Sequence, residues 1–324
     1  MKYKNIPGTD MNASAICLGG GSFCMENGKD ISFQLMDVFF EQGGNFIDTA
    51  NIYGKWLPSG LNISEMVIGQ WLKEKNNRDK LIIATKGGCP NLATMNIPRL
   101  SKKEVLRDLE ESSRSLQTDY IDLYWLHRDD ETLPVATIME YLNDFVKEGR
   151  IRYYGCSNWK LNRIKEAMDY TKKNHLQSFV GNQIMWSLAV PNEDAFDDKT
   201  MISMDKDLYD YHLQNHFTAI PYSTQANGFF EKLWNAPRIP LGEGIKRKYY
   251  NQINIDKLIL VDRIANELSI SITEVVLAYL MFQSFPTIPI IGCSSVEQLE
   301  KSLKAGELGL VNELIELLRS NPYL

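Results

Sequence analysis

The chain has 324 residues, of which 44% are hydrophobic and 23% charged, and its formal net charge is −6. This length suits one β/α barrel with additional elements or two smaller domains, and the composition is that of an ordinary globular protein. Because there is no basic excess, neither nucleic acid nor an anionic membrane is expected as the main partner. No apolar run approaches the roughly 20 residues that span a bilayer, and residues 1–7 lack the apolar stretch of a signal peptide.

The cysteines are scattered and odd in number, and no two of them form a Cys-x-x-Cys pair. They are Cys17, Cys24, Cys89, Cys156 and Cys293. This usage is typical of a reduced protein without a disulfide framework. We therefore expect a cytoplasmic protein, with Cys156 as a buried packing residue.

Short β-rich runs alternate with longer amphipathic stretches about eight times along the chain. Strands are predicted near residues 15–18, 45–48, 81–86, 121–126, 152–156, 180–184, 217–221 and 288–291. Helices are predicted near residues 32–42, 63–75, 101–116, 134–148, 160–173, 203–214, 256–268 and 295–305. Such alternation is typical of parallel strands joined by crossover helices, and the number of units favours a closed (β/α)8 TIM barrel over an open sheet. We expect a single barrel domain over residues 1–324.

Some segments lie outside this repeat. Residues 3–13 predict a β-hairpin that turns at residues 7–10 and covers the bottom of the barrel. Residues 222–253 predict a long connection rich in Gly and Pro, which is typical of a functional or mobile loop. A domain linker is the alternative, but the β/α pattern resumes afterwards. Extra C-terminal helices are predicted in 271–283, where Ser271 and Glu274 form a capping box, and over 311–320.

Polar side chains stand at the ends of consecutive predicted strands. Asp48 closes the run 45–48, Lys86 closes 81–86 and His127 closes 121–127. Tyr53 follows Asp48 in the next loop. The carboxyl ends of the strands of a β/α barrel meet at one mouth, so these four side chains are expected to converge there.

A phenol, an ammonium, a carboxylate and an imidazole at one mouth can deliver a proton to an oxygen that gains negative charge. Tyr53 is the candidate acid, and an ammonium within hydrogen-bond reach would stabilise its phenolate. Lys86 would supply that charge, Asp48 would hold Lys86, and His127 would orient or polarise a bound carbonyl. Taken singly, the four have ordinary alternatives as a turn aspartate, a packing tyrosine, a solvated lysine and a structural histidine. Their joint position favours a proton-delivery site.

Several segments carry a resemblance to a known family. They are residues 46–54 (FIDTANIYG), 83–86 (IATK), 119–127 (DYIDLYWLH), 149–158 (GRIRYYGCSN), 181–183 (GNQ), 221–223 (PYS) and 288–292 (IPIIG). In this order the chain resembles the aldo-keto reductases over nearly its whole length. Six or more motifs in register make the resemblance specific.

The resemblance implies reduction of an aldehyde or ketone by a nicotinamide cofactor without a metal. Tyr53 would be the general acid, tuned by Lys86 and Asp48, and His127 would orient the carbonyl. The positions that hydrogen-bond the nicotinamide carboxamide in the family are matched by Ser157, Asn158 and Gln183. Those that stack on the nicotinamide ring and hold the pyrophosphate are matched by Tyr222 and Ser223 with the loop that follows.

The adenosine end departs from the family pattern. Many relatives that use the phosphorylated cofactor place basic residues after the last strand and one turn into the next helix. Here these cofactor positions carry Gly292, Ser294 and Gln298. We expect NADPH as the cofactor and NADH as the alternative, with Lys301 or the cluster 246–248 (KRK) able to replace the missing charge.

The substrate pocket is expected from loops on the same face. The candidates are Phe23, Trp56, Arg128, Trp159 and Trp186. The polar run 128–130 could recognise a sugar or another polyhydroxylated carbonyl, or could instead be a solvated salt bridge. The expected partner is a small carbonyl substrate, and the protein is expected to be a monomer or a small homo-oligomer.

The sequence also allows two alternatives to a carbonyl reductase to be considered. A cofactor-binding regulatory or sensor subunit with slow turnover would be marked by an added interaction segment, and neither end carries one. A metal-dependent barrel hydrolase or lyase would need a ligand cluster, but the four histidines form no His-x-His or His-x-x-x-His pair. The glycines at 19–21 lack the spacing of a phosphate-binding loop and are interpreted as a close approach of backbone to the cofactor.

Overall fold

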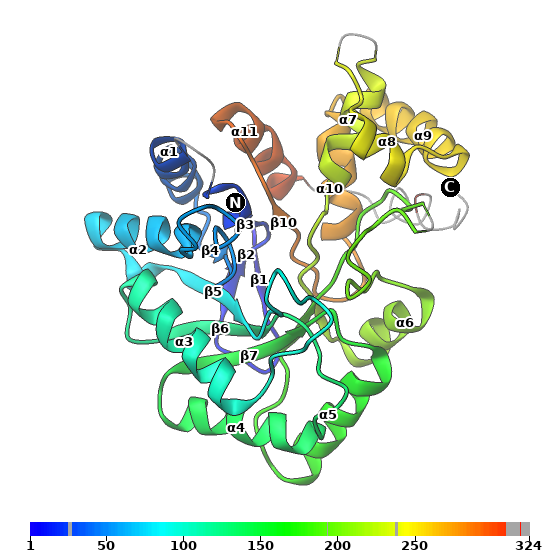
Figure 1. The fold of residues 1–324 in the computed structure, drawn as a ribbon. Helices are drawn as coiled ribbons and strands as arrows, with labels where there is room; N and C mark the ends of the chain where they lie inside the picture. Colours follow the sequence, from blue (N-terminus) through cyan, green and yellow to red (C-terminus); the bar gives the residue numbers. More distant parts are fainter. Residues whose placement is uncertain (25–27, 193, 237–238, 309–317, 319–324) are drawn as a thin grey trace.

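The structure is a computed structural model, and it describes every residue except 25–27, 193, 237–238, 309–317 and 319–324. Eight parallel strands form one sheet that is curled into a barrel, with helices on its outside (Figure 1). The barrel strands are β3 (Cys17–Gly19), β4 (Phe46–Asp48), β5 (Ile82–Gly87), β6 (Ile121–Leu126), β7 (Ile151–Ser157), β8 (Gly181–Gln183), β9 (Thr218–Ala219) and β10 (Ile290–Ile291). The (β/α)8 prediction is confirmed.

The strands pair in the order β10-β3-β4-β5-β6-β7-β8-β9. Backbone hydrogen bonds join β9 to the segment that leads into β10, since the Ala219 amide donates to the Pro286 carbonyl at 2.9 Å and the Ile288 amide donates to the Ala219 carbonyl at 2.9 Å. These bonds close the barrel. The carboxyl ends of all eight strands therefore surround one mouth.

The helices follow the strands in alternation and cover the outside of the barrel (Figure 1). They are α1 (Gly28–Glu41), α2 (Ile63–Lys75), α3 (Lys102–Leu116), α4 (Val135–Lys147), α5 (Leu161–Lys173), α6 (Lys206–Asn215), α7 (Phe229–Trp234), α8 (Glu243–Tyr249), α9 (Gln252–Leu268), α10 (Ile272–Met281) and α11 (Val296–Lys304). The predicted capping box is present at the start of α10, where Ser271 and Glu274 bond reciprocally to each other's backbone amides.

The predicted hairpin consists of β1 (Tyr3–Asn5) and β2 (Asn12–Ser14), which pair antiparallel. Between them, Ile6 and Met11 are almost fully buried, in one apolar cluster with barrel residues such as Phe46 and Leu123. The hairpin thus seals the end of the barrel opposite the mouth, as the sequence predicted.

The segment 222–253, predicted as a long irregular connection, contains a 3-10 turn (Ala226–Gly228) and the helices α7 and α8. Helix α9 begins at Gln252, four residues before the predicted start. Phe229, Phe230 and Tyr249 are buried in a second apolar cluster with residues of α9 and α10, which explains why α7 and α8 form. In Figure 1, α7, α8 and α9 lie together in yellow beside α10. The helix predicted over 311–320 lies outside the described residues, apart from Leu318.

Among the described residues, no single helix has the length and apolar character needed to cross a membrane. Only α9 and α10 taken together pass such a test by length and composition, and they are bent by 100° at the break between them.

The buried carboxyl group of Glu65 lies between α2 and the barrel wall. It accepts hydrogen bonds from the Thr85 hydroxyl on β5 and from the Asn62 amide. Burial raises the pKa of Glu65 to about 7, although the hydrogen bonds from Ser112, Thr85 and Asn62 act to lower it. Folding therefore favours the protonated form of this group.

This shift predicts how stability depends on pH. Between the ordinary Glu pKa of 4.5 and a folded value of about 7, the folded state keeps a proton that the unfolded state has released. The free energy of unfolding should therefore fall as the pH rises through this window, by up to roughly 3 kcal/mol. The glutamine of Glu65→Gln cannot ionise, so the free energy of unfolding of this variant should fall less between pH 5 and pH 8, as measured by urea unfolding. An equal fall in the free energy of unfolding of wild type and Glu65→Gln would contradict the raised pKa of Glu65.

Candidate active site

Four predicted side chains meet at the mouth of the barrel. Asp48 ends β4, Lys86 lies near the end of β5, His127 follows β6, and Tyr53 lies in the loop after β4. The Lys86 ammonium lies 2.6 Å from Asp48 Oδ2 and 3.3 Å from the Tyr53 hydroxyl. It also donates to the Thr49 carbonyl at 2.6 Å. The adjacent parallel pairing of β4, β5 and β6 places these groups side by side, because each chain segment leaves its strand at the same end.

The lysine and the aspartate form a buried ion pair. Both residues are 1% exposed. Burial alone would lower the pKa of Lys86, but the charge of Asp48 and its hydrogen bond more than offset that effect, so the pKa is raised. The Lys86 side chain therefore stays a cation next to the Tyr53 hydroxyl.

His127 is held as a neutral imidazole. Burial, followed by the positive charges of Arg128 and Lys86, lowers the pKa of His127 well below its usual value. Its ring lies edge-on to Tyr53 with the centroids 6.2 Å apart. Among the described residues, Nδ1 has no hydrogen-bond partner. Since no acceptor faces Nδ1, the tautomer with the proton on Nε2 is favoured.

Gln183 contributes a contact that the sequence did not predict. Its Nε2 donates to Asp48 Oδ1 at 2.9 Å, so both oxygens of Asp48 are occupied. Gln183 lies on β8, across the barrel from β4. Its Oε1 and its second N–H bond no described residue. Gln183 therefore fixes Asp48 and retains one acceptor and one donor for a ligand.

In contrast, both polar atoms of the Asn158 side chain already form hydrogen bonds within the protein. Its Nδ2 donates to Ser157 Oγ at 2.9 Å and to the His127 carbonyl at 3.4 Å. Its Oδ1 accepts from the Ile202 amide at 3.0 Å and from the Tyr222 hydroxyl at 2.7 Å. The predicted carboxamide contact of Asn158 would have to replace one of these bonds, whereas the Ser157 hydroxyl still has its proton to donate.

These groups suit a nicotinamide ring. A carboxamide needs one acceptor and one or two donors, and Ser157 with Gln183 can supply them. Tyr222 is half-buried beside them, and Ser223 is exposed with a positive φ of 56°. A non-glycine residue in this region is strained, which is common at ligand sites. The residues present therefore fit the nicotinamide end of the cofactor.

The adenosine end carries no spare cation at the predicted positions. Gln298 Oε1 accepts from both the amide and the hydroxyl of Ser294 at 3.0 Å. Lys301, one turn later, forms an ion pair with Glu231 at 2.5 Å. Gly292 is exposed with open space around it.

The basic cluster 246–248 is also engaged, and it lies on α8. Lys246 pairs with Glu243 at 2.7 Å, and Arg247 pairs with Asp197 at 2.9 Å. Lys248 lies over the ring of Phe196. The idea that this cluster folds over the cofactor is therefore not supported by the contacts that it makes.

Of the predicted substrate residues, Trp56 has the clearest access. It is half-exposed, and its ring lies edge-on to Tyr53 with the centroids 6.2 Å apart. Phe23 is 1% exposed and follows the 3-10 turn after β3. Trp56 thus forms an apolar wall next to the candidate acid.

Two predicted substrate residues pack elsewhere, which corrects the expectation. Trp159 is fully buried against Phe179, with its indole N–H donating to the Arg128 carbonyl. Trp186 is stacked on Phe285 and also contacts Tyr209 of α6 and Tyr279 of α10. The Trp159 indole is thus a packing residue, and the Trp186 indole lies against α6 and α10.

A model of the aldo/keto reductase family matches residues 15–321. The chain belongs to the aldo/keto reductase family. It is therefore an NAD(P)H-dependent carbonyl reductase.

Individual relatives agree with the family assignment. The chain is 28% identical over 333 residues to norsolorinic acid reductase B of Dothistroma septosporum, covering 98% of this chain and 80% of the relative. It is 28% identical over 353 residues to an NADP(+) aryl-alcohol dehydrogenase of Phanerodontia chrysosporium, covering 98% and 86%. A thermostable aldo-keto reductase crystallised with the inhibitor epalrestat superposes with a TM-score of 0.72 at 25% identity, covering 99% of both chains.

In the part of the chain that the structure describes, no three His, Cys, Asp or Glu side chains are grouped to hold a metal ion.

Arg128 forms an ion pair with the loop around residue 200. Its Nη2 lies 2.7 Å from Asp198, and its Nε donates to Thr200 at 2.7 Å. Its Nη1 donates to the His127 carbonyl at 2.8 Å. Arg128 is 9% exposed, and all three bonds tie the loop around residue 200 to the backbone of His127. Arg128 is therefore not free for a substrate hydroxyl, and it forms the loop salt bridge that was the alternative, although the Arg128 end of that bridge is buried.

No local pattern marks the bond between Arg128 and Asp198, since Asp198 lies 70 residues after Arg128. The neighbouring Asp129 is engaged by Arg163 at 3.0 Å. The polar run 128–130 therefore serves loop packing around the mouth.

The bonds of Arg128 to Asp198, Thr200 and the His127 carbonyl form a clamp between two loops. This clamp predicts an effect of Asp198 on catalysis. Asp198→Asn keeps the shape but removes the charge that holds Arg128, so the loop should loosen next to His127. A charged hydrogen bond contributes ~1.5–3 kcal/mol, and we expect kcat/KM for a carbonyl substrate to fall roughly threefold to tenfold. Asp194→Asn is the matched control, because Asp194 pairs with Lys199 in the same loop but is 92% exposed. Equal steady-state constants for the two variants would contradict the clamp.

Proposed function

We propose that Tyr53 is the general acid of this reductase in the reduction of an aldehyde or ketone to an alcohol. The observation that carries the proposal is the buried Lys86 ammonium, which lies 3.3 Å from the Tyr53 hydroxyl while it is paired with Asp48. A fixed positive charge at that distance stabilises the phenolate left when the proton is given away.

The nicotinamide cofactor, when bound, supplies the hydride that adds to the carbonyl carbon. As the hydride adds, negative charge grows on the carbonyl oxygen, and Tyr53 transfers its proton to that oxygen. His127 in its neutral form donates a hydrogen bond from Nε2 to the same oxygen and so orients the carbonyl. Ser157 and Gln183 would hold the carboxamide of the cofactor, and Tyr222 would support its ring.

The walls of the mouth favour an apolar, aromatic carbonyl over a sugar. Trp56 offers a half-exposed indole next to Tyr53, and aromatic pairs of this kind contribute about 0.5–1.5 kcal/mol beyond the burial of their surface. Arg128, the polar group considered for hydroxyl recognition, is already bonded on three sides. The names of the relatives, a norsolorinic acid reductase and an aryl-alcohol dehydrogenase, agree with this substrate class.

We further propose that NADPH is the better cofactor, but by a modest factor. Selection of a 2′-phosphate usually rests on a basic side chain, and Gln298 stands at the predicted position. The nearest cation on the same helix is Lys301, which is held by Glu231. Both reduced cofactors should therefore support turnover.

The acid is tested by Tyr53→Phe, which removes only the hydroxyl. Because a positioned acid contributes roughly 10²- to 10⁴-fold, kcat for benzaldehyde should fall about 10²-fold or more. Tyr170→Phe is the matched control, since Tyr170 is a tyrosine of α5 that bonds Glu140 away from the mouth. Near-wild-type turnover by a folded Tyr53→Phe protein would reject the assignment.

The same assay separates the substrate classes. Wild-type kcat/KM should be higher for benzaldehyde than for xylose, and the reverse order would favour a sugar reductase. Tight cofactor binding without turnover of any carbonyl would instead favour the sensor alternative.

The cofactor proposal is tested by Glu231→Gln. This change releases Lys301 toward the adenosine end, and the affinity for NADPH relative to NADH should rise by roughly threefold to tenfold. Glu243→Gln releases Lys246 on α8 and should leave the ratio unchanged. Titrations followed by tryptophan fluorescence measure both affinities. A wild-type preference for NADPH above a thousandfold would show that another basic residue reads the phosphate.

A further inference from the structure

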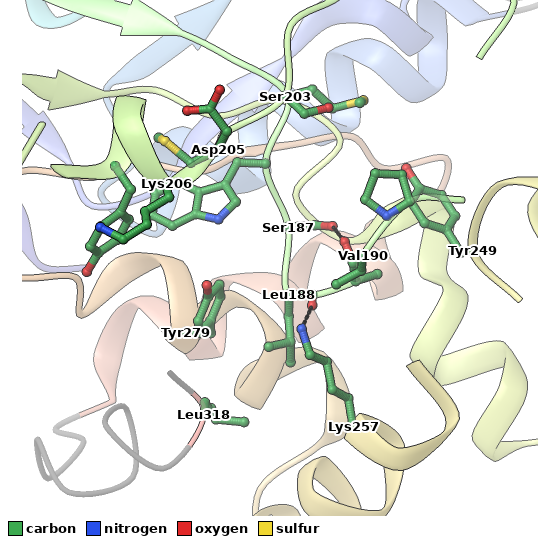
Figure 2. Close-up of a pocket in the computed structure, with 16 residues that line it drawn as sticks. Ser187, Leu188, Val190, Ser203, Asp205, Lys206, Tyr249, Lys257, Tyr279 and Leu318 are labelled. Atoms are coloured by element: carbon green, nitrogen blue, oxygen red, sulfur yellow. Dashed lines mark hydrogen bonds between the residues drawn. The ribbon is translucent and has the colours of Figure 1, made fainter. Parts of the chain in front are cut away.

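A second cavity lies between the segment that follows β8 and the helices α6, α8, α9 and α10. Its volume is about 410 Å³, within the usual range for small-molecule sites. The catalytic side chains Asp48, Tyr53, Lys86 and His127 do not line it. Figure 2 shows the segment from Ser187 to Val190 crossing the cavity, with Tyr249 and Tyr279 on opposite sides.

One buried cation is aimed at this cavity. Lys257 of α9 is 7% exposed, and its Nζ donates to the Leu188 carbonyl at 3.0 Å (Figure 2). Among the described residues, it has no other hydrogen-bond acceptor and no carboxylate partner. An ammonium has three N–H donors, so two of those of Lys257 have no acceptor among the described residues. Burial lowers the pKa of Lys257 to about 8.

Lys4 provides a comparison within the same chain. Burial also lowers the pKa of Lys4 to about 8. Lys4, however, donates to two carbonyl groups, those of Met281 and Thr287, and does not line the cavity. Lys4 therefore ties the N-terminal hairpin to the end of α10, whereas Lys257 lines the cavity and bonds a single acceptor in the described part of the chain.

The other charged groups of the cavity are already engaged. Asp205 accepts a hydrogen bond from the Leu208 amide as the N-cap of α6. Lys206 pairs with Asp210 one turn later. Among the described lining residues, Lys257 is thus the one charged group without a charged or capping partner.

The rest of the wall is apolar and aromatic. The larger lining side chains are Trp186, Leu188, Tyr209, Tyr249 and Tyr279. Rings of this kind hold a planar apolar body through edge and face contacts. A buried ammonium, in turn, gains most from an anion that can accept its unused N–H donors.

We propose that this cavity is a binding site for a planar aromatic carboxylate. The carboxylate accepts hydrogen bonds from Lys257, and the ring system lies among Trp186, Tyr249 and Tyr279. The site is separate from the catalytic mouth and does not depend on the reduction chemistry.

The test uses 2-naphthoate as the probe and 2-naphthamide as its uncharged match, in calorimetric titrations at pH 7. Lys257→Met removes the cation and keeps an apolar stem, and Lys73→Met, on the exposed face of α2, is the control. Wild type and Lys73→Met should bind 2-naphthoate equally. Lys257→Met should bind it ~10- to 100-fold more weakly, the range for a lost hydrogen bond between charged groups. The affinity for 2-naphthamide should be the same in all three proteins.

Three results overturn the proposal. The first is an absence of 2-naphthoate binding by wild type, and the second is an affinity of Lys257→Met for 2-naphthoate within twofold of wild type. The third needs no variant: in wild-type crystals soaked with 2-naphthoate, the probe occupies only the mouth over Tyr53. A carboxylate within hydrogen-bond distance of Lys257 Nζ in those crystals supports the site even if the variant does not fold.

Discussion

The mouth of this barrel depends on one buried ion pair, Lys86 with Asp48. Removing two charges from water is costly, and such a pair persists only when good geometry and further hydrogen bonds compensate for the lost hydration. Here the Thr49 carbonyl and the Gln183 amide provide those bonds. Loss of one partner would leave an isolated buried charge, at a cost of ~3–5 kcal/mol. These bonds fix the Lys86 ammonium next to the Tyr53 hydroxyl.

Closure of the barrel is a condition for this arrangement. Gln183 comes 135 residues after Asp48, and the two touch because β8 and β4 face each other across the same mouth. The N-terminal hairpin seals the opposite end with Ile6 and Met11, so the interior stays apolar below the polar layer. The scaffold thus keeps water from the ion pair on one side and leaves Tyr53 accessible on the other.

Much of this could be predicted from the sequence because it is encoded locally. Strand ends are marked by the change from apolar runs to polar residues, and this change indicates Asp48, Lys86 and His127. The helix of residues 272–281 was predicted from Ser271 and Glu274, which satisfy its first amides. The domain count, the oligomeric state and the cytoplasmic location stay predictions.

The features that were missed depend on contacts between distant segments. Glycines and prolines in 222–253 suggested a loop, but the burial of Phe229 and Tyr249 against α9 made helices there. Trp159 follows a cofactor motif in the chain, yet its ring points into the packing around Phe179. The sequence allowed Arg128 to contact a substrate, but in the structure it is paired with Asp198 from a distant loop. Side-chain direction and long-range pairing are not local properties of a sequence.

The central claim is that Lys86 acts on the chemical step through Tyr53. The most direct measurement is the rate of cofactor oxidation in a single turnover, by stopped flow, for wild type and Lys86→Met mixed with saturating NADPH and benzaldehyde. The account predicts that the rate falls by roughly 10²-fold or more, while the dissociation constant of NADPH changes less than about threefold. A Lys86→Met protein that binds NADPH normally and reduces benzaldehyde within a factor of about ten of wild type would contradict it.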